Sequence, residues 1–256
     1  MTRLSVLSVL VLLALPPLAA HAQSVSIDLG AAGQPGATAR IVQLTALITV
    51  LSLAPSLIMM MTAFTRIVIV LSLLRNALST QGTPPNIVLI GLALFLSFFV
   101  MQPTLEQAWT DGIQPMTEGR LTEMEGIRRA TEPFRDFMVR NTRDGDVAFF
   151  EDLARRNPKD HPPPANAPGP EGQAVPWRIL VPAFLVGELR RAFEMGFLLF
   201  LPFLVIDMVV ASLLMSLGMM MLPPSAVSLP FKLIFFVLVD GWRLVAGSLV
   251  QSFAGG

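Results

Sequence analysis

Charged residues lie inside the long apolar runs of this sequence, and this feature restricts its fold more than any other. A charge at the centre of a membrane helix costs about 2.5–3.5 kcal/mol on insertion scales, so such groups normally face protein or water. Only 14% of the 256 residues are charged and 53% are hydrophobic, whereas soluble domains are about 25% charged. We therefore expect an all-α membrane protein that works inside a polar, multi-subunit assembly.

The composition also argues against several classes of function. The chain has no cysteine and two histidines, His21 and His161, which excludes thiolate metal sites and makes histidine chemistry improbable. A net charge of zero predicts no nucleic-acid partner. The sequence shows no Gly-rich phosphate loop and no paired acids at metal-ligand spacing, so we expect no enzyme, cofactor or metal.

The N-terminal segment resembles a secretory signal peptide over residues 1–22. Arg3 precedes the apolar stretch Leu4–Leu15, and Ala20-His21-Ala22 provides an A-x-A cleavage site. The alternative is a membrane anchor, although the stretch is shorter than the roughly 20 apolar residues of a span. Residues 23–40 are rich in Gly, Ala and Ser and are expected to be flexible.

Two long helical hairpins with a small helical domain between them are the expected architecture. The first hairpin covers residues 41–104 and the second covers 179–256, while the charged segment 105–178 forms the small domain and ends in a Pro-rich linker. Arg66 and Arg75 lie toward the first turn, so that turn is expected in the cytoplasm and the middle domain in the periplasm.

Two local features of the helices are also predicted. Pro133 is expected to begin a new helix with Thr131 as its cap. Met59, Met60 and Met61 are expected to lie within the first long helix as packing residues.

One set of charges in the second hairpin is predicted to make assembly contacts. Spacing along a helix pairs Glu188 with Arg191 at i,i+3, and Arg190 with Glu194 at i,i+4. Asp207 has no neighbour of opposite charge in sequence, so we expect its partner on another helix or another subunit. The alternative for all these groups is that they reach the membrane interface, which is poor for the short side chain of Asp207.

The remaining charges in or beside the apolar runs are interpreted as interface or packing groups. Arg75, Lys232 and Arg243 are long enough to extend to the interface. Asp240 is three residues before Arg243 and is predicted to pair with it. Arg66 belongs to this group without an assigned partner.

A methionine triplet, Met219, Met220 and Met221, lies between Gly218 and the pair Pro223-Pro224, which break helices. Methionine is unbranched and repacks easily. A ring of these side chains around an axis would seal a pore and still deform around a passing chain. The alternative is a membrane turn filled by adaptable side chains, and composition does not decide between the two.

Several strings resemble the FliP family, whose members are core subunits of the flagellar type III export gate. The residues that carry the resemblance are Met60–Ile67, Leu73–Leu78, Pro84–Asn86, Pro202–Asp207, Gly218–Pro224, Leu229–Leu233 and Val239–Trp242. The resemblance implies a pentamer that assembles with FliQ- and FliR-like subunits in the bacterial inner membrane, at the flagellar basal body. It also implies that unfolded proteins pass through its centre, that Met219–Met221 form the gasket, and that surrounding protein shields the hairpins.

A small-solute or ion channel or transporter is the alternative function. Such proteins also carry charges in membrane helices, but they usually contain internal repeats. The second hairpin shows no convincing repeat of the first. The export-gate interpretation is therefore preferred.

Overall fold

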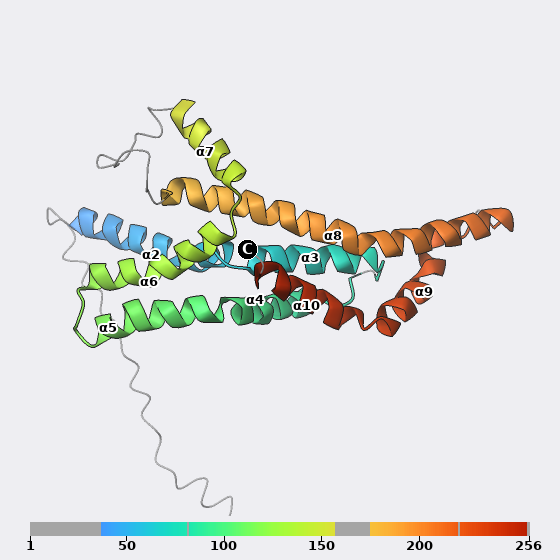
Figure 1. The fold of residues 1–256 in the computed structure, drawn as a ribbon, viewed down its shortest axis with the longest axis horizontal. Helices are drawn as coiled ribbons and strands as arrows, with labels where there is room; N and C mark the ends of the chain where they lie inside the picture. The colour runs from blue at the N-terminus through green and yellow to red at the C-terminus, as the bar shows by residue number, and fades with distance from the viewer. Residues whose placement is uncertain (1–36, 81, 157–174, 220, 255–256) are drawn as a thin grey trace, which may run out of the picture. The chain divides into compact units, whose positions relative to one another are not determined.

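The computed structural model describes residues 37–80, 82–156, 175–219 and 221–254. Its elements are α2 (Ala37–Met60), α3 (Phe64–Ala77), α4 (Asn86–Ala108), the π-helix η1 (Trp109–Ile113), α5 (Gln114–Thr117), α6 (Glu123–Arg140), α7 (Asp144–Arg156), α8 (Trp177–Ser216), α9 (Pro224–Leu238) and α10 (Gly241–Ala254) (Figure 1). No strand occurs among the described residues, which confirms the all-α prediction. The predicted signal peptide, most of the Pro-rich linker and Met220 lie outside them.

The chain divides into two compact units, residues 1–52 and residues 53–256. The described part of the first unit is helical from Ala37, although residues up to 40 were expected to be flexible. The second unit contains the last part of α2 and all the other helices. Every contact discussed below lies within this second unit.

The first long helix is interrupted, which corrects the prediction of one helix through the methionines at 59–61. α2 ends at Met60 and α3 begins at Phe64. The hydroxyl of Thr62 donates to the carbonyl of Met59 at 2.9 Å and accepts from the Phe64 amide at 3.3 Å. Such side-chain hydrogen bonds compete with the helical pattern. Met61 lies at this break and packs against the core, so a packing role is correct for that residue.

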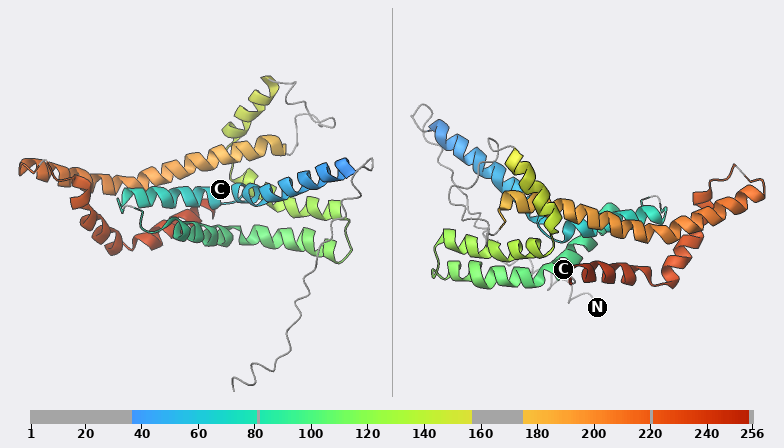
Figure 2. Two further views of the ribbon diagram at one scale, coloured as in Figure 1. Left: turned by 180° about the vertical axis from the view of Figure 1, so that it is seen from behind. Right: turned by 45° about the horizontal axis from the view of Figure 1, so that its top comes forward.

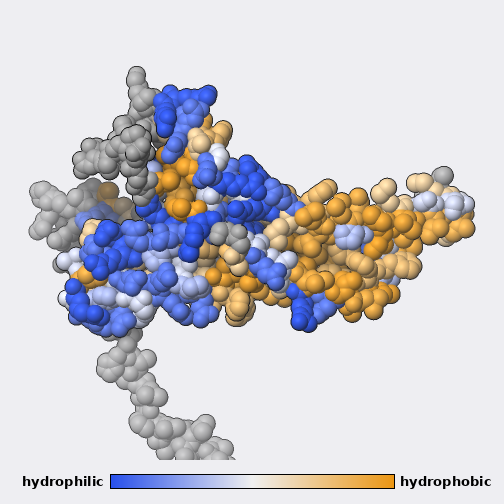
Figure 3. Space-filling model, in the orientation of Figure 1, coloured by the Kyte–Doolittle hydropathy of each residue, from blue (hydrophilic) through white to orange (hydrophobic). Residues whose placement is uncertain are grey.

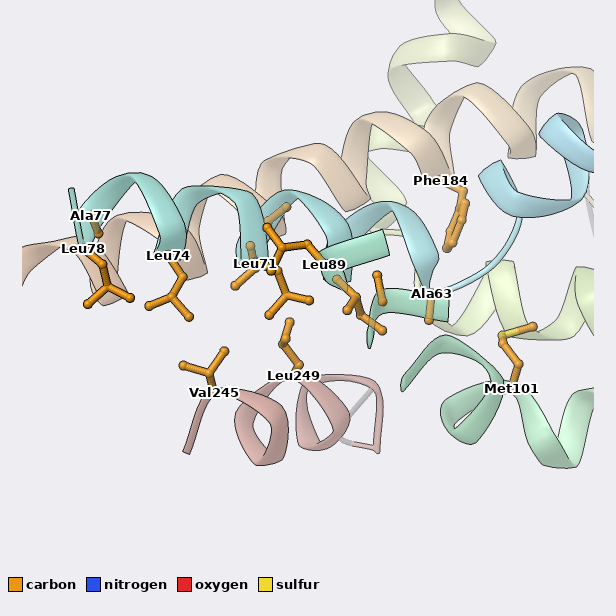
Figure 4. Packing of buried hydrophobic residues seen from close by; sticks show 14 of the residues in the cluster. Ala63, Leu71, Leu74, Ala77, Leu78, Leu89, Met101, Phe184, Val245 and Leu249 are labelled. Carbon is orange, nitrogen blue, oxygen red and sulfur yellow. The ribbon is translucent and has the colours of Figure 1, made fainter. Parts of the chain in front are cut away.

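α3 forms the centre of the core, between α8 and α4. Its residues Ile67 and Val70 are fully buried, and Leu71 and Leu74 point toward Leu249 and Val245 of α10 (Figure 4). Each such side chain contributes about 1.5–3 kcal/mol of burial energy. α8 approaches α3 closely at Gly196, where a Cβ atom would lie 2.2 Å from Leu73 Cδ1. This close packing positions the charged residues of both helices.

Two helical stretches, Asn86–Thr117 and Trp177–Ser216, are long and apolar enough to cross a membrane. α9 and α10 meet at an angle of 64° and would form a third span if they act as one bent segment. Asp240 lies at their junction with a φ of 51°. α3 contacts α4 and α8 contacts α9 across short connections, while the two-hairpin arrangement stays a prediction.

α6 runs through Pro133 without interruption, so the predicted helix start at this proline is wrong. The helix begins after Thr122, whose side chain accepts a hydrogen bond from the Glu125 amide at 3.4 Å. Thr122 and Glu125 have the spacing of a capping box, which is the stronger start signal. Thr131 caps nothing, because its hydroxyl donates to the carbonyl of Arg128 at 2.8 Å.

The helices of the middle segment pack on the two long apolar helices. α6 contacts α4 and η1, and the beginning of α7 contacts α8 while its far end projects away from that helix (Figures 1 and 2). Gly112 of η1 meets the backbone of Ala130 so closely that a Cβ atom would lie 2.5 Å from its nitrogen. Glycine is therefore required where η1 crosses α6.

Candidate functional site

A fully buried ion pair joins α3 to α8. Arg66 Nε donates to Glu188 Oε2 at 2.8 Å, and Arg66 Nη2 donates to Glu188 Oε1. Both side chains have 0% exposure. Two parallel hydrogen bonds of this kind make an arginine–carboxylate pair directional as well as strong. We call these two residues, with the α10 groups described next, the Arg66 centre.

The end of α10 completes the Arg66 centre. Arg66 Nη1 donates to Ser252 Oγ at 2.8 Å and to the Ser252 carbonyl at 3.1 Å. The guanidinium carbon lies 3.7 Å from the centroid of the Phe253 ring, in cation–π contact. Phe253 also stacks on Phe137 of α6 at 6.0 Å. A charge that the sequence placed in an apolar helix therefore links α3, α8, α10 and α6.

This geometry corrects the predicted partner of Glu188. The carboxylate binds Arg66, 122 positions away, rather than Arg191. Because Glu188 is fully buried inside the chain, its charge is matched internally. Arg191 is half-buried in α8, with Arg66, Arg143, Glu188 and Glu194 as its charged neighbours.

A second buried centre surrounds Lys232 of α9, and we call it the Lys232 centre. Lys232 Nζ donates to Asp207 Oδ2 at 2.6 Å, to the carbonyl of Ala77 at 2.9 Å and to Ser79 Oγ at 3.0 Å. Ser228 Oγ donates to the other oxygen of Asp207. The lysine side chain is 1% exposed and the aspartate side chain is 29% exposed.

The Lys232 centre corrects the predicted place of Lys232 and agrees with the prediction for Asp207. Lys232 does not extend to an interface, because its ammonium is enclosed by α8, α9 and the end of α3. Asp207 has its partner on another helix, which is one of the two outcomes that its isolated position in the sequence indicated. The two centres fix α8 against α3 at sites 19 residues apart along α8, at Glu188 and Asp207.

A third group of charges holds α7 against α8. Arg190 Nη2 donates to Asp146 Oδ1 at 3.0 Å, and Arg143 Nη2 donates to Glu194 Oε2 at 3.4 Å. The predicted pair of Arg190 with Glu194 is therefore wrong, because each residue pairs across helices instead. Arg190, Arg143 and Glu194 are about half exposed, so these pairs contribute little stability.

The other predicted interface groups lie in exposed or half-buried places. Arg75 donates to Asn86 Oδ1 and to the carbonyl of Pro84 at 3.4 Å, which links the end of α3 to the start of α4. Arg243 and Asp240 approach within 3.9 Å with both side chains exposed, which confirms their predicted pairing.

The methionine loop follows α8. Gly218 adopts a φ of 72°, which a side chain would disfavour. Met219 is 43% exposed and Met221 is 99% exposed. Exposed methionines on a loop are available for contact with another chain, and the gasket stays a prediction.

The comparisons with known proteins decide the family. Residues 47–249 match the FliP family, a segment that contains the Arg66–Glu188 pair, the Lys232 centre and the methionine loop. The chain belongs to the FliP family.

Individual relatives agree with this assignment. The chain is 53% identical to the flagellar biosynthetic protein FliP of Caulobacter vibrioides, over 99% of this chain and 92% of that protein. It is 47% identical to the protein of the same name from Agrobacterium fabrum, over 96% of this chain and 97% of the relative. For the protein of that name from Bacillus subtilis the identity is 47%, over 89% of this chain and 98% of the relative.

Several residues of the Arg66 and Lys232 centres could not be recognised as functional from the sequence. Ser252, Phe253 and Ser79 are ordinary residues of an apolar segment or a turn, and only the tertiary contacts show their role. Asp146 lies in the first turn of α7 and binds Arg190 of α8. Among the described residues, no group of three His, Cys, Asp or Glu side chains is arranged to hold a metal.

Proposed function

We propose that this chain is a core structural subunit of the flagellar protein export gate. The match to the FliP family over residues 47–249 carries the proposal. The relatives at 47–53% identity are flagellar biosynthetic proteins by name and are covered almost completely. In this role the chain forms part of a pore for unfolded flagellar proteins and is not an enzyme.

The distribution of charge and apolar surface supports a subunit that packs against others. The buried charges of α3, α8 and α9 are matched within the chain. What remains on the surface of α9 and of the second half of α8 is largely apolar (Figure 3). The exposed side chains include Phe197, Leu198, Val205, Met208, Phe231, Ile234 and Val237. Lipid or other apolar helices must cover such a surface.

In the proposed assembly, five copies of the chain surround an axis together with FliQ- and FliR-like subunits. An apolar groove of about 440 Å³ between α8 and α9, lined by residues such as Val209, Leu213 and Phe231, provides a place for a neighbouring helix. Arg190, Arg191, Glu194 and the exposed edge of Asp207 are the charged groups available for contacts between subunits. Met219–Met221 form the gasket around the axis.

The proposed location is the bacterial inner membrane at the flagellar basal body. Helices of sufficient length and apolar composition support insertion. The middle segment, with its many charges, lies on the periplasmic side in this proposal. Neighbouring subunits cover much of the apolar surface of the second half of α8.

Native mass spectrometry of the tagged chain, co-expressed with its neighbouring export genes, tests the proposal. A stable complex with five copies of this chain and additional small membrane subunits is the expected result. A lone monomer would favour a transporter instead.

The chain has no cysteine, so the single variant Met221→Cys gives a second readout. In a ring, oxidation would link neighbouring copies, whereas Cys at Phe149 of α7 serves as a control away from the axis.

A further inference from the structure

A cleft of about 400 Å³ lies where α4, the end of α6 and the end of α10 meet. One wall is apolar and comes from Phe99, Val100 and Pro103 of α4. Val250 and Phe253 of α10 also line it, and its polar part comes from Arg140 and Asn141, which follow Phe137 in the sequence. The cleft borders the Arg66 centre through Phe253 but contributes none of the ion-pair contacts there. Neither the family match nor the proposed pore assigns it a ligand.

The polar end of the cleft offers a cation and an unused acceptor. Arg140 is exposed, and its Nε donates to the Asp136 carbonyl at 3.3 Å, while its other nitrogens have no partner among the residues that the structure describes. Asn141 is 3% exposed. Its Nδ2 donates to the Phe137 carbonyl at 2.9 Å, which fixes the orientation of the amide. Asn141 Oδ1 has no hydrogen-bond partner among the described residues, and a buried acceptor of this kind normally finds one.

The cleft also lies at the boundary between apolar and charged surface. In α4 the apolar run from Ile87 ends near Met101, and Gln102 and Glu106 follow. Figures 1 and 3 share one orientation. The end of α10, marked C in Figure 1, lies where the surface in Figure 3 changes from hydrophilic to hydrophobic. The head group of a phospholipid occupies such a level in a membrane, with its acyl chains on the apolar side.

We propose that this cleft binds one phospholipid. The phosphate pairs with the guanidinium of Arg140, and an acyl chain lies between Phe99 and Val250. A donor group of the head, either the ammonium of ethanolamine or a hydroxyl of glycerol, serves Asn141 Oδ1 once the end of α10 opens slightly. The charge of Arg140, the unused acceptor of Asn141 and the apolar side chains suit the phosphate, the donor group and the acyl chain of this ligand. The lipid would brace α10 against α4 beside the Arg66 centre.

Native mass spectrometry with added lipid tests the proposal on the full-length chain, as a monomer or in its complex. Phosphatidylethanolamine, phosphatidylglycerol and diacylglycerol are added separately at equal concentration. We expect one tightly retained phospholipid and no retained diacylglycerol, which lacks the phosphate. Arg140→Gln should weaken retention about tenfold or more, as expected for a lost charge-assisted hydrogen bond. If the chain retains one of the two phospholipids more tightly, its head group identifies whether an ammonium or a hydroxyl donates to Asn141 Oδ1.

The matched control is Arg120→Gln, because Arg120 is also exposed but pairs with Glu118 and does not line the cleft. Equal lipid retention by the two variants would overturn the proposal. A protein occupant would also overturn it, and Arg140→Cys labelled with a photoactivatable thiol reagent detects one by cross-linking to another chain. Complex formation is read separately from the mass, so loss of the lipid with normal assembly does not affect the proposed function. If the chain fails to assemble but still binds the lipid, the proposed function is refuted and the lipid proposal is not.

Discussion

The guanidinium of Arg66 and the carboxylate of Glu188 meet in the interior of the molecule, although 122 positions separate them in the sequence. Neither side chain has any exposure to solvent. Removing two charges from water is costly, and only good geometry and additional hydrogen bonds offset that cost. Ser252 and Phe253 provide those additional contacts. The pair therefore fixes which face of α8 meets α3.

Removing one member of this pair should be much more harmful than removing both. Glu188→Gln or Arg66→Gln leaves an unmatched buried charge, which costs roughly 3–5 kcal/mol. The double variant Arg66→Met with Glu188→Met should recover most of that loss. The measurement is the thermal unfolding and the yield of monodisperse protein in detergent. Arg243→Gln is the control, since its pair with Asp240 is exposed and should change stability very little.

The Lys232 centre predicts an asymmetry between its two charges. Asp207→Ala leaves a 1% exposed ammonium without its anion, whereas Lys232→Met leaves a carboxylate that is 29% exposed and still bonded to Ser228. We expect Asp207→Ala to destabilise the protein more and to impair assembly or export. Complex yield and swimming motility measure these effects. Normal values for Asp207→Ala, or a larger loss for Lys232→Met, would contradict this interpretation of the centre.

Most helices could be predicted from the apolar runs, because segments of that length and composition can form few structures other than helices. The partners of the charges were not predictable from spacing along one helix. Glu188 and Arg191 satisfy the i,i+3 rule, but burial on α8 turns Glu188 toward Arg66 of α3. The rule assigns a gain of only a few tenths of a kcal/mol, and a tertiary contact that removes both groups from solvent easily exceeds it.

Two boundary errors have similar causes. The break at Thr62 depends on one hydroxyl that bonds the Met59 carbonyl, and the surrounding methionines and alanine all favour a helix. Pro133 suggested a helix start, yet α6 already begins at the capping box of Thr122 and packs on η1 through Ala130. In both places the boundary depends on a threonine hydroxyl, Thr62 or Thr122, that bonds a nearby backbone group.

The first turn of α6 should respond to acid. Arg128 and then Arg129 donate to Glu125, and they lower the pKa of that carboxyl from 4.5 to about 2. The folded-state pKa is depressed, so the stabilising contribution is present above pH 4.5 and is lost as the pH falls toward 2. Hydrogen exchange of the amides at 123–129 should therefore accelerate over that window relative to a Glu125→Gln variant. Parallel behaviour of the two proteins would show that the arginine contacts do not form.

The methionine loop gives the most direct prediction about the pore. Replacing Met219, Met220 and Met221 with alanine removes the long adaptable side chains from the loop, and Met219 and Met221 are both exposed and free to meet other copies. We expect membranes that contain the assembled gate to leak ions or small solutes. Efflux of a small dye or of potassium from cells that express the complete complex is the measurement.

The control must separate leakage through the pore from a badly folded subunit. Met59 and Met60, at the end of α2, are also exposed methionines but lie outside the loop. Replacing them with alanine should leave permeability unchanged at equal complex yield. If the triple alanine variant assembles normally and the membrane remains tight, the loop is a packing turn and the gasket interpretation is wrong. Leakage without change in yield would instead place the loop at the narrowest part of the pore.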